Sequence, residues 1–405
     1  MPSQQAKEVE STAVTIRAAN QPRFDTLPPL GLYVHVPWCI QKCPYCDFNS
    51  HAIGEQKPPE SAYIEALIAD LEQDLPLIWG RPIQTLFIGG GTPSLLSGEG
   101  IDNLLSQLRA RLPFAPELEI TLEANPGTVD CGRFRAFREA GVNRLSIGIQ
   151  SFHDDSLRRL GRIHTAQQAR QAVTLAREAG FERINLDLMF GLPGQSAAMA
   201  ERDLRCALAL RPTHISYYQL TIEPNTHFHH QPPARLEEDG LWEIQERAKH
   251  LLADHGYEQY EISAYARRGH RCRHNLNYWR FGDYLGIGAG AHSKLTLPHS
   301  HSVVRLAKVR HPQRYLTTAA TPERIQQKNH LQPHEIALEF MMNALRLTDG
   351  FETALFAERT GLPLGFVRKP LEIAEHKGLI VRDTLHIRPT ELGRRYLNNL
   401  LELFC

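Results

Sequence analysis

The run Leu32-Tyr-Val-His-Val-Pro-Trp-Cys39-Ile-Gln-Lys-Cys43-Pro-Tyr-Cys46 joins a short apolar segment to three closely spaced cysteines. Its first five residues are mostly apolar and partly β-branched, as strand residues are, and a proline ends the segment. Similar apolar runs recur as far as residue 220, and stretches with apolar residues at helical spacing follow them. We predict strands at 32–36, 85–88, 119–123, 144–149, 184–189 and 214–220, and helices at 60–74, 98–111, 131–140, 166–179, 197–210 and 236–255.

This alternation predicts an α/β fold. Segments such as Leu86-Phe87-Ile88 are apolar throughout, which is typical of parallel strands covered on both faces. Six strand–helix units in series predict a partial (β/α)6 barrel. Residues 330–405 have mostly helical patterns around two short strands at Asp383-Thr384, which predicts a small, winged-helix-like C-terminal domain. The expected organisation is a flexible tail at 1–28, the barrel at 29–262, a basic, His-rich linking segment at 263–329, and the C-terminal domain at 330–405.

The charges balance overall but not locally. The 405-residue chain has 45 Lys and Arg against 45 Asp and Glu, and this zero balance argues against general nucleic-acid binding. Residues 223–261 contain nine acids and three bases, whereas residues 267–314 contain ten bases, six histidines and one acid. The first 21 residues lack the apolar core of a secretory signal, and no apolar run approaches the ~18 residues of a membrane span. We therefore expect a cytoplasmic protein.

The three cysteines form a C-x3-C-x2-C motif directly after the first predicted strand. Thiolates on one loop can each bind one iron of a [4Fe–4S] cluster, and Cys39, Cys43 and Cys46 would leave the fourth iron without a protein ligand. A structural zinc is the first alternative, and its fourth ligand would be His35 or Asp47. Three unrelated buried thiols are the second alternative. The odd total of seven cysteines argues against a disulfide framework.

Polar groups at later strand ends predict a ligand pocket near the cysteines. Gly89-Gly90-Gly91-Thr92 follows the second strand, where glycines let the backbone approach a ligand. Glu123 ends the third strand, Gln150 ends the fourth, and Asp187 lies within the fifth. A polar residue in an apolar strand is unfavourable unless it is satisfied or used, and three in succession are best explained by one shared polar ligand.

In their order along the chain these motifs resemble those of the radical S-adenosylmethionine (SAM) superfamily, in its coproporphyrinogen III dehydrogenase-like branch. The resemblance covers nearly the whole chain and includes Glu-Ala-Asn-Pro at 123–126, Ser-Ile-Gly-Ile-Gln-Ser-Phe at 146–152 and Gly-Ile-Gly-Ala-Gly-Ala-His at 286–292. It implies a radical SAM barrel in which Cys39, Cys43 and Cys46 hold the cluster and SAM binds its open iron. The SAM-contacting residues that it implies are Tyr33, Tyr45, Gly90, Gly91, Thr92, Glu123, Gln150, Arg162 and Asp187. Arg162 is expected to pair with Glu123 or with the SAM carboxylate.

The branch contains oxygen-independent coproporphyrinogen III dehydrogenases and heme chaperones of the HemW type. The dehydrogenases typically continue the motif to a fourth cysteine, and Phe48 stands at that position here. His274-Asn-Leu-Asn-Tyr278-Trp279 fits the H-N-x-x-Y-W motif associated with heme binding in the chaperones. Imidazole can ligate heme iron, and Tyr and Trp offer flat apolar surface beside a porphyrin. The alternative is a structural loop with a satisfied histidine.

We therefore predict a heme chaperone that transfers heme to an acceptor protein, with the dehydrogenase as the alternative. The predicted heme-binding residues are His274, Asn275, Tyr278 and Trp279. The neighbouring Arg267, Arg268, Arg271, Arg273 and Arg280 are expected to hold the heme propionates, or to pair with the acidic block at 223–261. The same basic segment leaves docking on an acidic partner or an anionic membrane open. The expected cofactors are a [4Fe–4S] cluster and SAM, and cleavage of SAM is left open.

Overall fold

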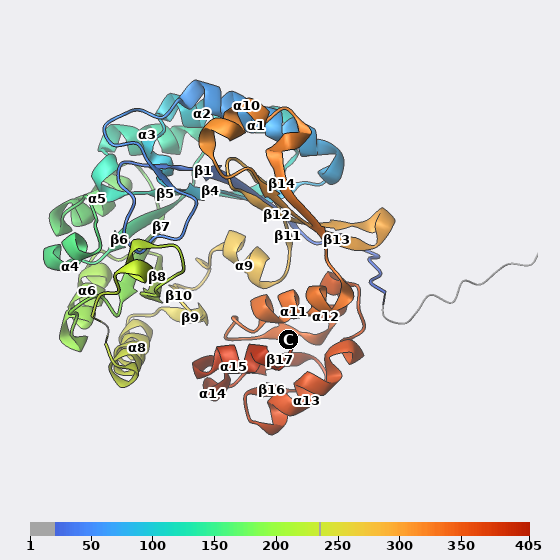
Figure 1. The fold of residues 1–405 in the computed structure, drawn as a ribbon. Helices are drawn as coiled ribbons and strands as arrows, with labels where there is room; N and C mark the ends of the chain where they lie inside the picture. The colour runs from blue at the N-terminus through green and yellow to red at the C-terminus, as the bar shows by residue number, and fades with distance from the viewer. Residues whose placement is uncertain (1–20, 235) are drawn as a thin grey trace, which may run out of the picture.

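The computed structural model describes residues 21–234 and 236–405. In these residues one twelve-stranded sheet forms the main body, and a small domain packs beside it (Figure 1). The strands of the large sheet, in spatial order, are β14 (Ile325–His330), β13 (Ser302–Lys308), β12 (His292–Leu297), β11 (Asp283–Ile287), β1 (Leu30–Val36), β4 (Ile83–Gly90), β5 (Phe114–Ala124), β6 (Arg144–Gln150), β7 (Arg183–Phe190), β8 (His214–Gln219), β10 (Ala264–Ala266) and β9 (Glu258–Glu261).

Seven consecutive strands, from β11 through β1 to β8, are parallel. The six strands predicted from the sequence are all present, and the prediction of a partial α/β barrel is confirmed. The seventh parallel strand, β11, was not predicted as a strand. It begins with Asp283, a fully buried carboxylate that pairs with Arg81 at 2.9 Å and with Lys294 at 3.1 Å. A buried charge at a strand start hides the apolar signal on which the prediction depends.

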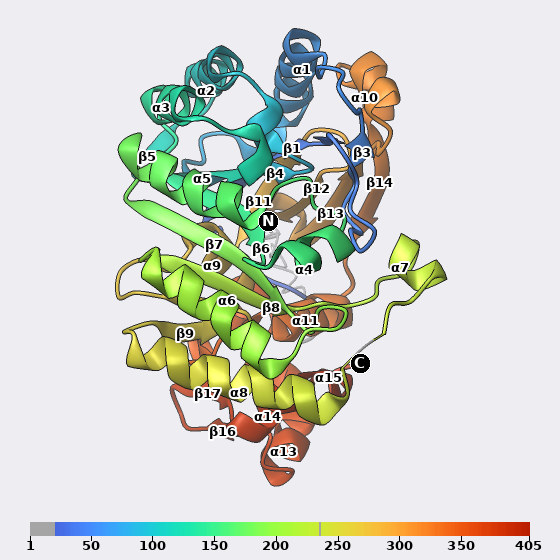
Figure 2. The same ribbon diagram turned by 90° about the vertical axis from the view of Figure 1, so that its left-hand side faces the viewer.

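Helices cover the outer face of the parallel strands, as Figure 2 shows from the side. Tyr63, Leu67 and Leu71 lie on the buried face of α1, in agreement with their helical spacing. The helices of this part are α1 (Glu60–Ile78), α2 (Gly98–Arg111), α3 (Cys131–Ala140), α4 (Asp154–Arg159), α5 (Ala166–Glu178), α6 (Ala197–Ala209), α7 (His227–His230), α8 (Glu238–Asp254), α9 (Arg273–Trp279) and α10 (Pro312–Thr318). The six predicted helices are among them, with ends shifted by a few residues.

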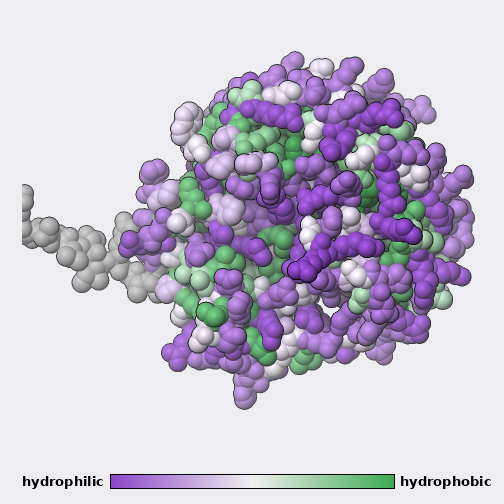
Figure 3. Space-filling model, turned by 180° about the vertical axis from the view of Figure 1, so that it is seen from behind, coloured by the Kyte–Doolittle hydropathy of each residue, from purple (hydrophilic) through white to green (hydrophobic). Residues whose placement is uncertain are grey.

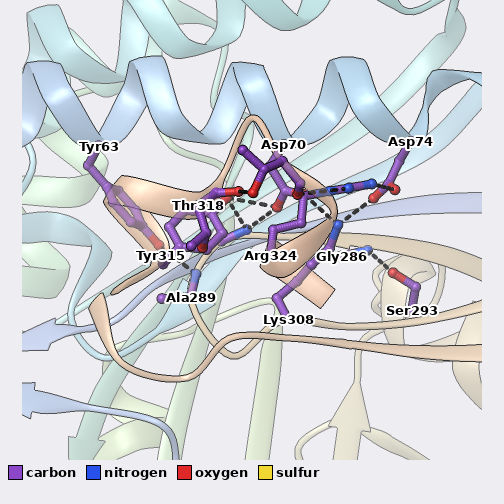
Figure 4. Close-up of polar contacts among 12 residues, drawn as sticks. Tyr63, Asp70, Asp74, Gly286, Ala289, Ser293, Lys308, Tyr315, Thr318 and Arg324 are labelled. Carbon is purple, nitrogen blue, oxygen red and sulfur yellow. Dashed lines mark hydrogen bonds and ion pairs between the residues drawn. The ribbon is translucent and has the colours of Figure 1, made fainter. Parts of the chain in front are cut away.

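Residues 263–329 are not a link between two domains but an integral part of the large sheet. Their strands β12, β13 and β14 extend it beyond β11 in antiparallel order. Much of the basic charge that suggested a separate segment is neutralised inside the fold. Lys308 of β13 is fully buried and contacts Asp70 and Asp74 of α1, and Arg324 binds the same two carboxylates at 3.0 and 2.5 Å (Figure 4).

The same network fixes the loop between β11 and β12. Tyr315 donates a hydrogen bond to Asp70 and accepts one from the backbone N–H of Gly288 at 3.0 Å. Tyr63 accepts from the N–H of Ala289 at 3.0 Å and donates to the carbonyl of His35 at 2.7 Å. Helix α1 therefore ties the loop 288–291 to the end of β1, where the cysteine motif begins (Figure 4).

The C-terminal domain has its own hydrophobic core around Phe340. Its helices are α11 (Pro333–Ala344), α12 (Thr353–Thr360), α13 (Arg368–His376), α14 (Glu391–Arg395) and α15 (Leu397–Glu402), and its sheet consists of β15 (Phe351–Glu352), β17 (His386–Pro389) and β16 (Ile380–Arg382). The predicted mixture of helices and a small hairpin is present. Helix α9 lies between this domain and the large sheet (Figure 1).

The predicted flexible tail falls mostly outside the described residues. Its last part, residues 21–28, differs from the prediction because it packs onto the fold. Phe24 is buried in the C-terminal core, and the N–H of Arg23 donates to the carbonyl of Gly361 at 2.8 Å. Arg81 binds the carbonyl of Pro28 at 2.7 Å.

The surface shows no continuous apolar face on the side drawn in Figure 3. That side is mostly hydrophilic, and hydrophobic residues appear there in separate patches. Across the described parts of the chain, none of the helices combines the length and the apolar character that crossing a membrane requires.

Candidate functional site

The cysteine motif follows the carboxyl end of β1. Pro37 ends that strand, and β2 (Trp38–Cys39) pairs with β3 (His51–Ala52), which closes the intervening loop. Cys39, Cys43 and Cys46 line one cavity of about 390 Å3 at the ends of the parallel strands, which we name the cysteine cavity. The loop thus lies where barrel proteins carry their functional groups.

Polar side chains donate hydrogen bonds to two of the three thiols. The Thr92 hydroxyl donates to Cys39 Sγ at 3.4 Å, and Arg162 Nη1 donates to Cys43 Sγ at 3.7 Å. Burial raises the pKa of the Cys39 and Cys46 thiols, so their ionised forms need a cationic partner such as a metal. All three thiols reach one cavity from one loop, and this donor set fits an iron–sulfur cluster.

A single zinc ion fits the same residues less well. Among the described residues, no three His, Cys, Asp or Glu side chains lie close enough to share one metal ion. His35, a fourth zinc ligand considered from the sequence, has both ring nitrogens in use. Its Nδ1 lies 3.0 Å from the Tyr33 hydroxyl, and its Nε2 lies 2.8 Å from the Asn49 carbonyl.

The glycine segment packs against the cysteine loop. A Cβ on Gly90, whose φ is +115°, would lie 2.6 Å from the His35 ring, and one on Gly91 would lie 2.6 Å from the carbonyl oxygen of Trp38. The N–H groups of Gly91 and Thr92 donate to the carbonyls of Val36 and Trp38, both at 2.7 Å. These glycines are therefore required by close packing. The N–H groups of Gly91 and Thr92 are used by the fold, and that of Gly90 donates to Glu123.

Two half-buried carboxylates line the cysteine cavity from β5 and β7, the strands on either side of β6. Glu123 Oε2 accepts a hydrogen bond from the Gly90 N–H at 3.0 Å, and burial together with the nearby Asp187 raises the Glu123 pKa to about 8. Burial also raises the pKa of Asp187, although Ser146 donates a hydrogen bond to it at 2.9 Å. Two acids with raised pKa values in one cavity are typical of a functional site.

Gln150 has a backbone conformation that non-glycine residues rarely adopt. Its φ is +66°, and the hydroxyl of Tyr218 donates to its Oε1 at 2.6 Å. Such strain is concentrated at functional sites, so the prediction that Gln150 belongs to a binding site gains support.

Tyr218 and Ser216 of β8 also line the cysteine cavity and were not predicted. They are two residues apart on a predicted barrel strand and therefore share one face of it, which is the signal that could have identified them.

Arg162 does not form the predicted pair with Glu123. Its Nη2 donates to the carbonyl of Gly148 at 2.8 Å and its Nη1 donates to Cys43, so the guanidinium lies beside the cysteine loop.

Tyr45 is half-buried in the cysteine cavity. Of the nine residues predicted to contact SAM, the cavity collects eight: Tyr45, Gly90, Gly91, Thr92, Glu123, Gln150, Arg162 and Asp187. Tyr33, the ninth, lies in the adjoining cavity described below.

The predicted heme motif forms α9, with His274 and Tyr278 one turn apart. His274 is 1% exposed, its Nδ1 lies 2.8 Å from the Thr85 hydroxyl and its Nε2 lies 2.9 Å from the Tyr278 hydroxyl. Burial lowers the His274 pKa to about 3, so the ring is neutral. Glu119 accepts from the N–H groups at the start of the helix, where a negative charge is favourable.

A second cavity adjoins the cysteine cavity. Only two of the four motif residues, Tyr278 and Trp279, line it. It has a volume of about 590 Å3, and we name it the α9 cavity. Tyr278, Trp279 and Tyr33 line it, and Phe48, Gly90 and Glu123 border both cavities. His274 and Asn275 instead line a smaller space of about 230 Å3 beneath Tyr278.

The arginines expected to hold propionates do not line the α9 cavity. Arg271 pairs with Asp349 at 3.1 Å and with Glu258 at 3.5 Å, and Arg273 binds the carbonyl of Glu117. The Glu258 pair supports the alternative of internal pairing with the acidic block. The cationic residues of the cavity come from β12, β13 and the segment after them: Lys294, Arg305, Lys308 and Arg310.

Parallel strands with this cysteine loop and glycine segment at their carboxyl ends define a radical SAM protein. A family model of the Radical SAM superfamily matches residues 33–207, and one of the HemN C-terminal domain matches residues 331–396. The chain is 49% identical over 378 residues to the heme chaperone HemW of Escherichia coli K12, covering 93% of this chain and 98% of that one. It is 35% identical over 389 residues to HemW of Bacillus subtilis, covering 92% and 98%. The chain belongs to the HemW family.

The solved structures agree on the fold. Coproporphyrinogen III oxidase (HemN) of Escherichia coli, described as a radical SAM enzyme, superposes with a TM-score of 0.79. The match covers 93% of this chain and 90% of that one at 22% sequence identity. At this identity the match supports a shared architecture.

Proposed function

We propose that the protein binds heme in the α9 cavity and transfers it to an acceptor protein. The observation that carries the proposal is this cavity itself, which has the size of a cofactor site and is walled by Tyr278 and Trp279 of the predicted motif. It borders the cysteine cavity through Phe48, so heme would lie next to the cluster. Membership of a family whose named members are heme chaperones supports the same function.

The four motif residues have two different parts in this proposal. Tyr278 and Trp279 form the wall of the heme site. His274 and Asn275 support that wall from beneath, because His274 holds the Tyr278 hydroxyl and stacks on Phe87 with ring centroids 5.2 Å apart. A rigid aromatic wall favours a flat ligand such as a porphyrin, since less freedom is lost on binding.

The cysteine cavity would hold the [4Fe–4S] cluster on Cys39, Cys43 and Cys46, with SAM beside it. Bound SAM and cluster would supply one-electron chemistry at this position. Glu123 and Asp187 would bind the positively charged parts of SAM, and Gln150 would be fixed toward it by Tyr218.

The acceptor is a separate protein in this proposal, and delivery takes place in the cytoplasm or at the surface of a membrane. Co-sedimentation with vesicles tests the membrane part. Binding to vesicles of anionic phosphatidylglycerol, absent with neutral phosphatidylcholine, supports peripheral docking. If the protein binds neither kind of vesicle, delivery takes place in solution.

The experiment that tests the function compares heme binding with decarboxylation. Anaerobically reconstituted protein is titrated with heme and, in parallel, incubated with coproporphyrinogen III, SAM and a reductant. We expect saturable heme binding with a new Soret band and no protoporphyrinogen. Robust formation of protoporphyrinogen would overturn the proposal in favour of the dehydrogenase. Phe48, in place of a fourth cysteine, is the residue that favours our reading.

A further inference from the structure

The α9 cavity contains one histidine whose ring nitrogens contact no hydrogen-bond partner among the residues that the structure describes. His292 begins β12, lines this cavity and is solvent-exposed. Within the described parts of the chain its ring makes no hydrogen bond. His35, the other histidine of the cavity, uses both of its nitrogens. His274 does the same and lies outside the cavity.

The remaining candidate ligands in the cavity are also engaged. The Tyr33 hydroxyl contacts His35, the Tyr278 hydroxyl contacts His274, and the Tyr284 hydroxyl contacts Arg305. Histidine, cysteine, methionine and tyrosine are the usual protein ligands of heme iron. No cysteine or methionine lines the cavity in the part of the chain that the structure describes.

The backbone on both sides of His292 is held firmly. The hydroxyl of Ser293 accepts a hydrogen bond from the Gly286 N–H at 2.9 Å, as Figure 4 shows. On the other side, the loop 288–291 is bound by Tyr63 and Tyr315. A ligand on a fixed strand start is preorganised, as a metal-binding side chain needs to be.

Among the residues that the structure describes, one cation of the cavity has no carboxylate partner. Arg305 pairs with Glu339, Lys294 pairs with Asp283, and Lys308 is enclosed by its two aspartates. Arg310, just after β13, is exposed and forms no ion pair with any residue that the structure describes. A free guanidinium beside an open cavity is suited to bind a carboxylate in a bidentate manner.

An apolar side chain completes the site. Phe48, on the cysteine loop, is 60% exposed. It is far from Tyr278 and Trp279 in the sequence but lines the same cavity. An exposed large apolar residue beside a cavity often marks a binding surface. The indole nitrogen of Trp279 is buried without a hydrogen-bond partner among the described residues.

From these contacts we infer that His292 is the axial ligand of heme iron in the α9 cavity, and that Arg310 binds one heme propionate. Phe48 and Trp279 contact the porphyrin. The inference rests on the proposed heme-binding function and refines it, because it moves the iron ligand from His274 to His292. His274 then acts as a positioning residue for Tyr278.

Visible spectra of heme titrations test the ligand. The full-length, cluster-loaded protein is compared with His292→Ala, His292→Gly, His274→Ala and, as a control, His299→Ala on the exposed tip of the same hairpin. We expect His292→Ala to shift the Soret band and to weaken binding at least tenfold. Added imidazole should restore the band in His292→Gly, and His299→Ala should behave as wild type. Folding of each variant is verified by its SAM affinity and its circular dichroism spectrum.

The arginine is tested with a modified heme. Arg310→Ala should bind heme about tenfold more weakly without moving the Soret band. Heme dimethyl ester, whose propionates are blocked, should bind equally to the wild type and to this variant.

The outcomes distinguish the inference from the function on which it rests. An unchanged spectrum in His292→Ala, together with a lost band in His274→Ala, overturns the inference and leaves the proposed function standing. Absence of heme binding by the wild type overturns the proposed function itself.

Discussion

The buried state of His274 gives a pH-dependent stability that can be calculated. Its pKa falls from the usual ~6.5 to about 3 because burial disfavours the charged ring and Arg144 adds repulsion. Between these values the unfolded chain binds a proton that the folded chain does not. The stability contribution is therefore fully present above pH 6.5 and is lost as the pH falls toward 3. From pH 7.5 to pH 5 the loss amounts to about 2 kcal/mol.

His274→Phe tests this reasoning, because phenylalanine preserves the ring but cannot bind a proton. At pH 7.5 the variant should be less stable by about 2–4 kcal/mol, since Thr85 and Tyr278 each lose a hydrogen-bond partner in the interior. At pH 5 the difference from wild type should shrink by about 2 kcal/mol. Other buried histidines are common to both proteins and cancel in the comparison.

The assay is urea unfolding of the apoprotein at both pH values, followed by circular dichroism, with His299→Ala as the exposed control. An equal gap between wild type and variant at pH 7.5 and pH 5 would refute the calculation. It would mean that the His274 ring takes up a proton in the folded state, and that its nitrogens are available to a ligand.

Further predictions concern the cluster, SAM, the buried ion network and the heme wall. Cys43→Ala should abolish the stable binding of iron and sulfide, which in the wild type should reach about four of each per chain; unchanged iron content would contradict the cluster site. SAM affinity, measured by calorimetry, should rise with pH as Glu123 ionises near pH 8, and Glu123→Gln should reduce this dependence to the part that comes from Asp187; the same slope in the variant would exclude Glu123. Lys308→Met should cost about 3–5 kcal/mol in urea unfolding, because two buried aspartates lose a partner; a loss below about 1 kcal/mol would show that water reaches them. Trp279→Ala should weaken heme binding without changing SAM affinity, and an equal loss of both would indicate general disruption of the fold.

The local patterns of the sequence were sufficient to predict the parallel strands and their helices. Apolar runs such as that of β1 depend only on neighbouring residues, and the glycines beside Glu123 mark backbone contacts that follow directly from a strand end. The residues of the cysteine cavity could be predicted for the same reason. Most of the predicted ones lie at or just after the ends of parallel strands, and such ends meet at one edge of the sheet, whereas Ser216 and Tyr218 of β8 were missed.

The β11–β14 extension could not be predicted in this way. Its charges are buried by partners far away in the sequence, as Lys308 and Asp70 are, 238 residues apart. The orientation of α9 could not be predicted either. A helix of seven residues has too little periodicity to show that His274 lies on its buried side. The basic residues around the motif likewise did not reveal that Arg271 forms ion pairs while Arg310 forms none with the residues that the structure describes.

The roles of Tyr278, Trp279 and His292 all depend on heme lying in the α9 cavity, beside the cluster. Crystals of the heme-loaded, cluster-containing protein can test it through anomalous scattering at the iron absorption edge. We predict a compact group of iron atoms at Cys39, Cys43 and Cys46 and one separate iron next to His292, inside the cavity walled by Tyr278 and Trp279. A lone iron elsewhere in the molecule, or none beyond the cluster in crystals whose spectrum shows bound heme, would contradict the account.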